Sequence, residues 1–217
     1  MRIRSFIVVY GLVVAILLFA DRRPVSGQPD HYSHVVDLTA ADNAAAPDAQ
    51  ISSDSGTRII SPAALIPGTW SAGQIPPERL IAPLVVMTVK TAPGHAQITL
   101  DDIAEWETRH GVVPQGAVVA IRGVGASSHS SRQLALTADA AQFLMDARYV
   151  LGFAIETPAD LTTDRTLARQ LALHGAYVVE GAARFSALPD TGSLVIVAPA
   201  KNKNAAEAPV RVLAMVR

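Results

Sequence analysis

The sequence predicts an α/β fold in which a mixed sheet is flanked by helices. Short runs rich in β-branched and other apolar residues, typical of buried strands, alternate with longer segments whose apolar residues recur at helical spacing. Hydrophobic residues make up 50% of the 217 residues, which is enough for the core of one domain of this size. The chain contains no cysteine, so we expect apolar packing, without disulfide bonds, to hold the fold together.

The predicted strands are apolar runs, several of them rich in β-branched residues, that lie between turn-forming residues. Residues 40–50, rich in Ala, Asp, Asn and Pro, follow the first strand as a loop. The polar residues 201–204 form an exposed turn before the last strand. In chain order, the strands are residues 34–39, 85–90, 117–121, 150–155, 177–179, 194–198 and 210–216.

Predicted helices separate several of these strands. Thr99 is a good N-cap for the first helix, and Ile103 and Trp106 follow at a spacing that places both on its buried face. The second helix covers residues 137–146. The third covers residues 165–173 and ends just before a glycine, which is a common helix stop.

The N-terminus predicts export. After a short basic start, residues 6–20 form an apolar run that is too short to span a bilayer comfortably. Small residues at positions 25–27 are typical of a cleavage site, so residues 1–27 are predicted to be a signal peptide. The alternative is a retained membrane anchor, because the charged residues at 21–24 also fit the flank of an uncleaved segment. In both cases we expect residues 28–217 to form a single domain in the periplasm or outside the cell.

The overall charge argues against two classes of partner. Charged residues make up 17% of the chain, and the formal net charge is -1. A protein that binds nucleic acid or anionic lipid by electrostatics carries a clear excess of basic residues. We therefore expect no nucleic-acid partner, and contact with a membrane only if the N-terminal segment is retained.

Residues 54–64 read Asp-Ser-Gly-Thr-Arg-Ile-Ile-Ser-Pro-Ala-Ala. This segment resembles the signature of the cyclase family, which includes the bacterial kynurenine formamidases and reads His-x-Gly-Thr-His-x-Asp-x-Pro-x-His. The matching glycine, threonine and proline are Gly56, Thr57 and Pro62. The positions that the family uses for its chemistry hold other residues here, namely Asp54, Arg58, Ile60 and Ala64.

Further segments extend the resemblance over residues 34–217. Residues 152–159 resemble the family's Gly-x-x-x-Asp-Thr-Pro-Ser, with Glu156 in place of the aspartate. A Gly-x-x-x-x-Glu motif, which in the family ends in a metal-binding glutamate, ends here at Glu180. The family's metal-binding histidine on the preceding helix falls on Ala168. Shorter similarities are found at residues 34–39, 116–123 and 208–211.

The resemblance implies the swivelling β/β/α domain of the cyclase and formamidase type. It also implies a Zn or Mn ion in family members, which use histidines, an aspartate and a glutamate as ligands. Of that ligand set only Glu180 is present here, whereas a divalent ion needs about three or four donors. We therefore expect no metal cofactor in this chain.

Arg58 is the candidate replacement for the metal ion. Two carboxylates buried together repel each other unless one takes up a proton or a cation lies between them. We expect Arg58 to lie between Asp54 and Glu180; the alternative is that its side chain points to solvent. Glu156 completes the candidate pocket, although it equally fits an exposed strand end.

Two functions fit these observations. The first is an exported, non-catalytic member of the family, a pseudoenzyme, that binds a small aromatic or anionic ligand through Arg58. The second is an active arylformamidase-type hydrolase that uses an altered site on an amide, lactone or ester, for example one from tryptophan catabolism. Family members are commonly homodimers or larger, so the resemblance also implies a homo-oligomer.

Two other groups of polar residues have simpler explanations. The serines at 127–131 surround His129, but no Gly-x-Ser-x-Gly elbow accompanies them, which favours a solvated loop over a catalytic triad. His31 and His34 are three residues apart, a spacing that suits a metal site on a helix. The apolar residues that follow them predict a strand instead.

Overall fold

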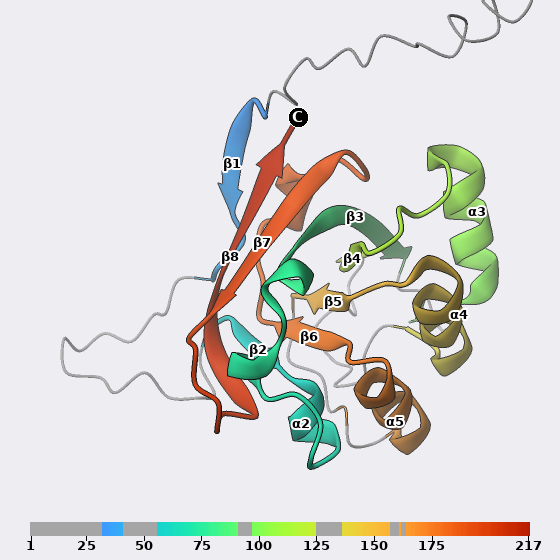
Figure 1. Cartoon of the computed structure of the whole chain (residues 1–217). Helices are drawn as coiled ribbons and strands as arrows, with labels where there is room; N and C mark the ends of the chain where they lie inside the picture. Colours follow the sequence, from blue (N-terminus) through green and yellow to red (C-terminus); the bar gives the residue numbers. More distant parts are fainter. Residues whose placement is uncertain (1–31, 41–55, 91–96, 125–135, 157–160, 162–163) are drawn as a thin grey trace, which may run out of the picture. The chain divides into compact units, whose positions relative to one another are not determined.

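The computed structural model describes residues 32–40, 56–90, 97–124, 136–156, 161 and 164–217 (Figure 1). The N-terminal segment that we predict to be a signal peptide or anchor lies outside this part of the chain. Among the described residues, no helix is long and apolar enough to cross a membrane.

The strands of the described part form one sheet that closes on itself. Its order is β1-β8-β2-β6-β5-β4-β3-β7, and β7 also pairs with β8, so seven strands complete a barrel (Figure 1). Strand β1 pairs with β8 outside that ring. The strands are β1 (His34–Asp37), β2 (Arg58–Ile60), β3 (Ile81–Lys90), β4 (Val118–Val124), β5 (Gly152–Ile155), β6 (Tyr177–Glu180), β7 (Ser193–Pro199) and β8 (Glu207–Val216).

The helices connect the parallel strands. Strands β3, β4, β5 and β6 are parallel neighbours, and parallel neighbours need a crossover connection, which is usually helical. Helices α3, α4 and α5 supply these crossovers and lie on one side of the strands (Figure 1). The helices are α2 (Pro62–Leu65), α3 (Leu100–His110), α4 (Ala138–Arg148) and α5 (Arg165–Leu173), with short 3-10 turns η1 (Ala72–Gln74), η2 (Pro77–Arg79) and η3 (Phe185–Ala187).

Capping residues set where the three longer helices begin. Thr99, Thr137 and Asp164 precede α3, α4 and α5, and each side chain accepts a hydrogen bond from a backbone N–H of the first helical turn. Such a cap contributes about 1 kcal/mol to helix stability. The start of α3 at Thr99 and the bounds of α5 are as the sequence predicts.

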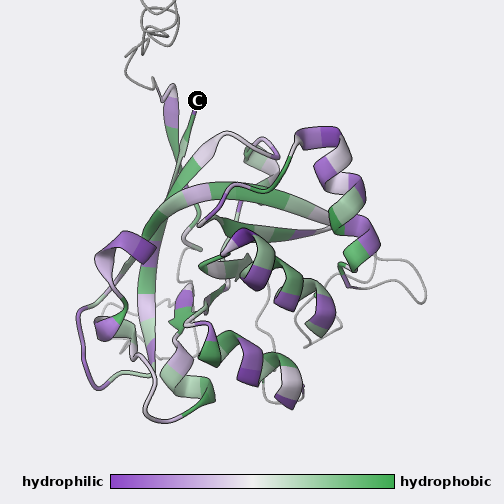
Figure 2. Cartoon of the chain, turned by 45° about the vertical axis from the view of Figure 1, so that its right-hand side comes forward, coloured by the Kyte–Doolittle hydropathy of each residue, from purple (hydrophilic) through white to green (hydrophobic). Residues whose placement is uncertain are grey.

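The core has two layers because side chains alternate along each strand. In β4, Val118 and Ala120 belong to the cluster inside the barrel, whereas Val119 and Ile121 belong to the cluster under the helices. Trp106 of α3 is part of the helix-side cluster. Figure 2 shows the strands as largely hydrophobic, whereas α3 carries hydrophilic residues over much of its surface. Full burial of one large apolar side chain contributes about 2–3 kcal/mol.

The structure confirms the mixed α/β fold. The bounds of several elements shift by a few residues, β3 for example beginning at Ile81 and β8 at Glu207, and two larger features differ from the sequence prediction. Strand β2 and helix α2 were not predicted, because elements of three and four residues are too short to show a periodic pattern. Closure of the sheet was also not predicted, because it depends on the contact between β7 and β8, not on any local signal. The swivelling arrangement that the resemblance implies stays a prediction.

Candidate functional site

The segment that precedes β2 is fixed by a close approach to the end of β6. Thr57 is buried, and its hydroxyl donates a hydrogen bond to the Gly181 carbonyl at 2.7 Å and accepts one from the backbone N–H of Ala40 at 2.8 Å. Gly56 and Gly181 both have positive φ, 78° and 65°. A Cβ on Gly181 would lie 2.5 Å from the Gly56 carbonyl oxygen, so only glycine fits there.

Arg58 and Glu180 face each other across this junction. The two residues are register partners in the antiparallel β2–β6 pair. Arg58 Nε donates to Glu180 Oε2 at 3.0 Å, and Arg58 Nη2 lies 2.9 Å from the same oxygen. The Glu180 side chain is 1% exposed and that of Arg58 is 21% exposed. A carboxylate this deeply buried requires a partner of opposite charge, and Arg58 supplies it.

Arg58 also reaches a second carboxylate, on β8. Its Nη1 lies 3.5 Å from Oε2 of Glu207, whose side chain is 41% exposed. Strand β8 pairs with β2, and Glu207 is the register partner of Ile60. The described contacts therefore place Arg58 between Glu180 and Glu207, and the alternative that its side chain points freely to solvent is wrong. Asp54, the second partner expected from the sequence, lies outside the described residues.

Glu156 lies on the same edge of the sheet as Glu180. It follows β5, which runs parallel to β6 with Ala154 opposite Val179. The Glu156 side chain is exposed, unlike that of Glu180. The structure thus brings Arg58 and Glu180 into direct contact and leaves Glu156 near the surface of the same edge.

Apart from Asp54, which lies outside the described residues, apolar residues occupy the other positions at which the resemblance would place metal ligands or a proton-transfer group. Ile60 is buried in the helix-side core, and Ala64 of α2 packs against that core. Ala168 lies in α5, the helix that packs against α2. Among the described residues, no group of three or more His, Cys, Asp or Glu side chains is arranged to hold a metal ion. Of the described residues at these positions, only Glu180 carries a metal-binding group, and its Oε2 is engaged by Arg58.

A separate pocket of about 320 Å³ opens between β3 and α3. It contains none of the residues that the sequence marks as a candidate site. Strands β2 and β3 are not neighbours in the ring, so this pocket is distinct from the Arg58–Glu180 pair. The serines at 127–131 and His31 lie outside the described residues, whereas His34 lies in β1, a strand as expected.

Comparison with protein families decides the affiliation of the chain. The model of the family described as putative cyclase matches residues 19–160. The chain belongs to the cyclase family. A comparison with curated proteins gives no match for this cyclase-family chain.

Solved structures with the same fold include two isatin hydrolases. Isatin hydrolase A from Labrenzia aggregata, bound to benzyl benzoate, is 24% identical, with a TM-score of 0.68 over 96% of this chain and 99% of that one. Isatin hydrolase A from Ralstonia solanacearum is 24% identical, with a TM-score of 0.67 over 85% and 92%. A potential metal-dependent hydrolase with cyclase activity is 21% identical, with a TM-score of 0.62 over 85% and 98%. At these identities the likeness shows a shared fold.

Proposed function

We propose that this cyclase-family protein is non-catalytic and binds a small anionic or aromatic ligand, with Arg58 in the place that a metal ion takes in the family signature. The observation that supports the proposal is the ion pair between Arg58 and the buried Glu180. A guanidinium stays protonated at any working pH. It therefore neutralises the carboxylate permanently and repels a divalent cation from the same space.

The chemistry of the family signature depends on a metal that activates water. A bound ion lowers the pKa of water from about 15.7 to about 7, which generates the nucleophile at neutral pH. Ile60 and Ala64 supply neither a ligand nor a base at the corresponding positions. With these residues, metal-assisted hydrolysis has no nucleophile, whereas binding through a cation is still available.

The ligand class follows from the guanidinium group. Arginine binds carboxylates and other planar anions through two parallel hydrogen bonds. Arg58 is partly exposed, and its Nη1 lies 3.5 Å from the exposed Glu207, so a ligand carboxylate would compete with Glu207 for the guanidinium group. Isatin hydrolase A from Labrenzia aggregata holds benzyl benzoate, and a further isatin hydrolase, 19% identical with a TM-score of 0.66, holds the product analogue thioisatinate; both compounds are aromatic. These neighbours support an aromatic acid as the first compound class to test.

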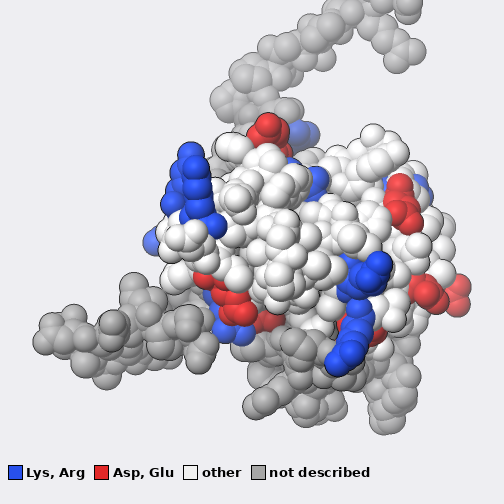
Figure 3. Space-filling view, turned by 60° about the horizontal axis from the view of Figure 1, so that its bottom comes forward, with Lys and Arg blue, Asp and Glu red and all other residues white. Residues whose placement is uncertain are grey.

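The distribution of charged residues on the surface favours a small molecule over a polyanion as the ligand. On the face shown in Figure 3, basic and acidic residues are interspersed among uncharged ones. Nucleic-acid binding proteins concentrate basic residues on one face or stripe.

The same proposal includes four further expectations from the sequence. They are removal of residues 1–27 as a signal peptide, export of residues 28–217 as one domain, the swivelling arrangement of that domain and a homo-oligomeric state.

The test combines elemental analysis, an activity assay and ligand binding on the purified protein. We expect less than stoichiometric Zn or Mn, no hydrolysis of aryl formamides or isatin, and a rise in Tm with aromatic carboxylates such as anthranilate. The Tm rise should disappear in Arg58→Gln and persist in Arg169→Gln, which changes an exposed arginine on α5. Tm shifts that are equal in both variants would contradict a role for Arg58 in binding.

The alternative is an active hydrolase with an altered site, and it is favoured by the hydrolase neighbours named above. One stoichiometric metal ion per chain, together with turnover that a chelator abolishes, would establish this alternative and refute the non-catalytic proposal. Turnover without metal would instead indicate a different site.

A further inference from the structure

The outer face of the barrel at β1, β8 and β7 is apolar. Helices α3, α4 and α5 cover the outside of the barrel at the parallel strands, whereas β1, β8 and β7 lie away from these helices (Figure 1). Side chains alternate along a strand, and Val36, Val195 and Val212 belong to the cluster inside the barrel. The residues on either side of them therefore point outward, onto a face that α3, α4 and α5 leave uncovered.

Strand register places seven of these outward residues in two adjacent rows. The rows cross the antiparallel pairs β1–β8, β8–β7 and β7–β3. Side chains directly opposite each other in such pairs lie about 4.5–5.5 Å apart, so each row is continuous. We call these seven residues the outer sheet patch, and they are Val35, Met215, Leu194 and Pro83 in one row and Leu213, Ile196 and Ile81 in the next.

The outer sheet patch is open to solvent. Val35 is 59% exposed and Ile81 is 55% exposed, and the other five residues are half-buried. Four strands about 4.8 Å apart and two rows about 7 Å apart, with side-chain margins of about 5 Å, give a patch of roughly 400 Å². This is as large as the largest apolar patch on a typical monomer, and such patches are often interaction sites.

The rim of the patch carries charges of both signs. At the β1 end of the second row, Arg211 Nη2 lies 2.7 Å from Asp37 Oδ2, and both side chains are accessible to solvent. A partner such as anionic lipid or nucleic acid requires an excess of basic residues, whereas this rim pairs one base with one acid. Two identical rims of this kind can approach each other without net repulsion.

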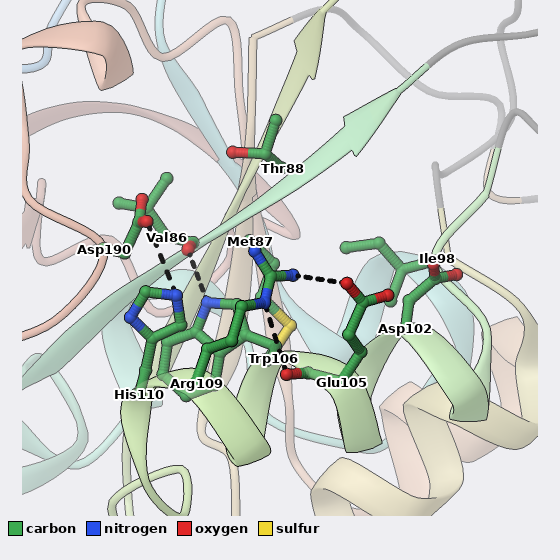
Figure 4. Close-up of a pocket in the computed structure, with 10 residues that line it drawn as sticks. All are labelled: Val86, Met87, Thr88, Ile98, Asp102, Glu105, Trp106, Arg109, His110 and Asp190. Carbon is green, nitrogen blue, oxygen red and sulfur yellow. Dashed lines mark hydrogen bonds and ion pairs between the residues drawn. The ribbon is translucent and has the colours of Figure 1, made fainter.

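The sheet surface favours an extended partner over a small molecule. In the β3–α3 pocket, side chains surround a concave space and bond to one another, as Trp106 does to the Val86 carbonyl and Arg109 to Glu105 (Figure 4). The outer sheet patch is instead one face of a β-sheet. Two sheets pack face to face about 10 Å apart with interdigitating side chains, and a second copy of the chain presents the same two apolar rows.

We propose that two copies of this chain form a homodimer by packing their outer sheet patches together across a two-fold axis. The inference rests on the homo-oligomeric part of the proposed function and names its surface. It is separate from ligand binding, because Arg58 lies on β2 and is not part of the patch. Contact between the two patches buries roughly 800 Å² in total, which is small for a specific interface, so the dimer dissociates at concentrations on the order of micromolar.

The test is sedimentation equilibrium of the full purified chain, in which we expect a reversible monomer–dimer equilibrium between about 1 and 200 µM. Val35→Lys and Ile81→Lys should each weaken self-association at least about tenfold, because the ammonium group loses hydration in an apolar contact. The matched control is Val112→Lys, which should leave self-association unchanged. Val112 is 66% exposed and follows α3, outside the patch.

Both patch residues are already exposed in the monomer, and thermal unfolding of each variant confirms that it is folded. A wild-type chain that stays monomeric at about 200 µM would overturn the inference and the homo-oligomeric state together. A dimer that both patch variants leave intact would overturn the surface alone, and so would equal weakening in Val112→Lys. Metal content, turnover and the Tm rise with anthranilate are measured separately, so failure of the ligand-binding proposal is distinguishable from each of these outcomes.

Discussion

Replacement of Arg58 by methionine tests whether a guanidinium holds the buried carboxylate in place. Methionine keeps much of the apolar stem and removes the charge, so Glu180, at 1% exposure, loses the partner that lies 2.9 Å away. Removal of one partner of a fully buried pair costs about 3–5 kcal/mol. Arg58 is partly exposed and Glu207 more so, which lets water compensate in part, and we expect a loss of about 2–3 kcal/mol.

The assay is urea unfolding of the wild type, Arg58→Met, Glu180→Gln and the double variant. For a chain of this length, the expected loss corresponds to a fall in Tm of about 5–10 °C. The double variant should be more stable than the sum of the two single effects predicts, by at least about 1 kcal/mol, because the two single changes remove the same Arg58–Glu180 interaction. Arg211→Met is the control, since Arg211 is 62% exposed in its pair with Asp37 and should lose less than about 1 kcal/mol. Additive single effects, or a loss in Arg58→Met no larger than in this control, would refute the reasoning.

Two further predictions concern stability. Gly181→Ala should cost at least about 2 kcal/mol in urea unfolding, because its φ is positive and the new Cβ meets a carbonyl oxygen. Gly192→Ala, with positive φ and open space around it, should cost about 1 kcal/mol, and equal losses would show that the close approach does not matter. Hydrogen bonds from Arg148 lower the pKa of Glu107, against the opposing effect of burial. This pair therefore stabilises the fold above the pKa of an unfolded glutamate, about 4.3, and its contribution is lost as the pH falls through the lower folded value. The difference in unfolding free energy between wild type and Glu107→Gln should be present at pH 7 and shrink toward pH 3; a constant difference would contradict the assignment.

Local signals account for the elements that the sequence predicts well. Thr99 and the glycine after α5 mark helix ends through capping chemistry that acts within a few residues. The β2–β8 pairing, in contrast, joins residues about 150 positions apart in the chain and leaves no local pattern. For this reason Glu207 was missed as a partner of Arg58, although it opens the last strand. Knowledge that Ile60 lies opposite Glu207 would have been needed to find it.

The contact between Arg58 and Glu180 was predicted from the resemblance, because both residues fall on positions that surround one site in the family. The β3–α3 pocket had no such signal. Its residues come from β3, α3 and the segment before β7, and each has an ordinary interpretation in the sequence: Trp106 as a core residue, Asp102 as part of a capping box. Only their arrangement in space makes them a pocket.

The residues of the family signature that this chain retains are those that fix the conformation of the backbone. Gly56 adopts a positive φ, Thr57 joins two segments through its hydroxyl, and Pro62 occupies the first turn of α2, where its missing N–H costs nothing. Arg58, Ile60 and Ala64, the described residues at the positions for chemistry, take no part in the hydrogen bonds of Thr57, and Ile60 packs in the core instead. Similarity at these backbone-fixing residues is therefore consistent with the barrel that this chain shares with family members, and it does not require that the chain catalyses the same reaction. Family membership is therefore compatible with either proposed function, and metal content together with turnover, not fold, decides between them.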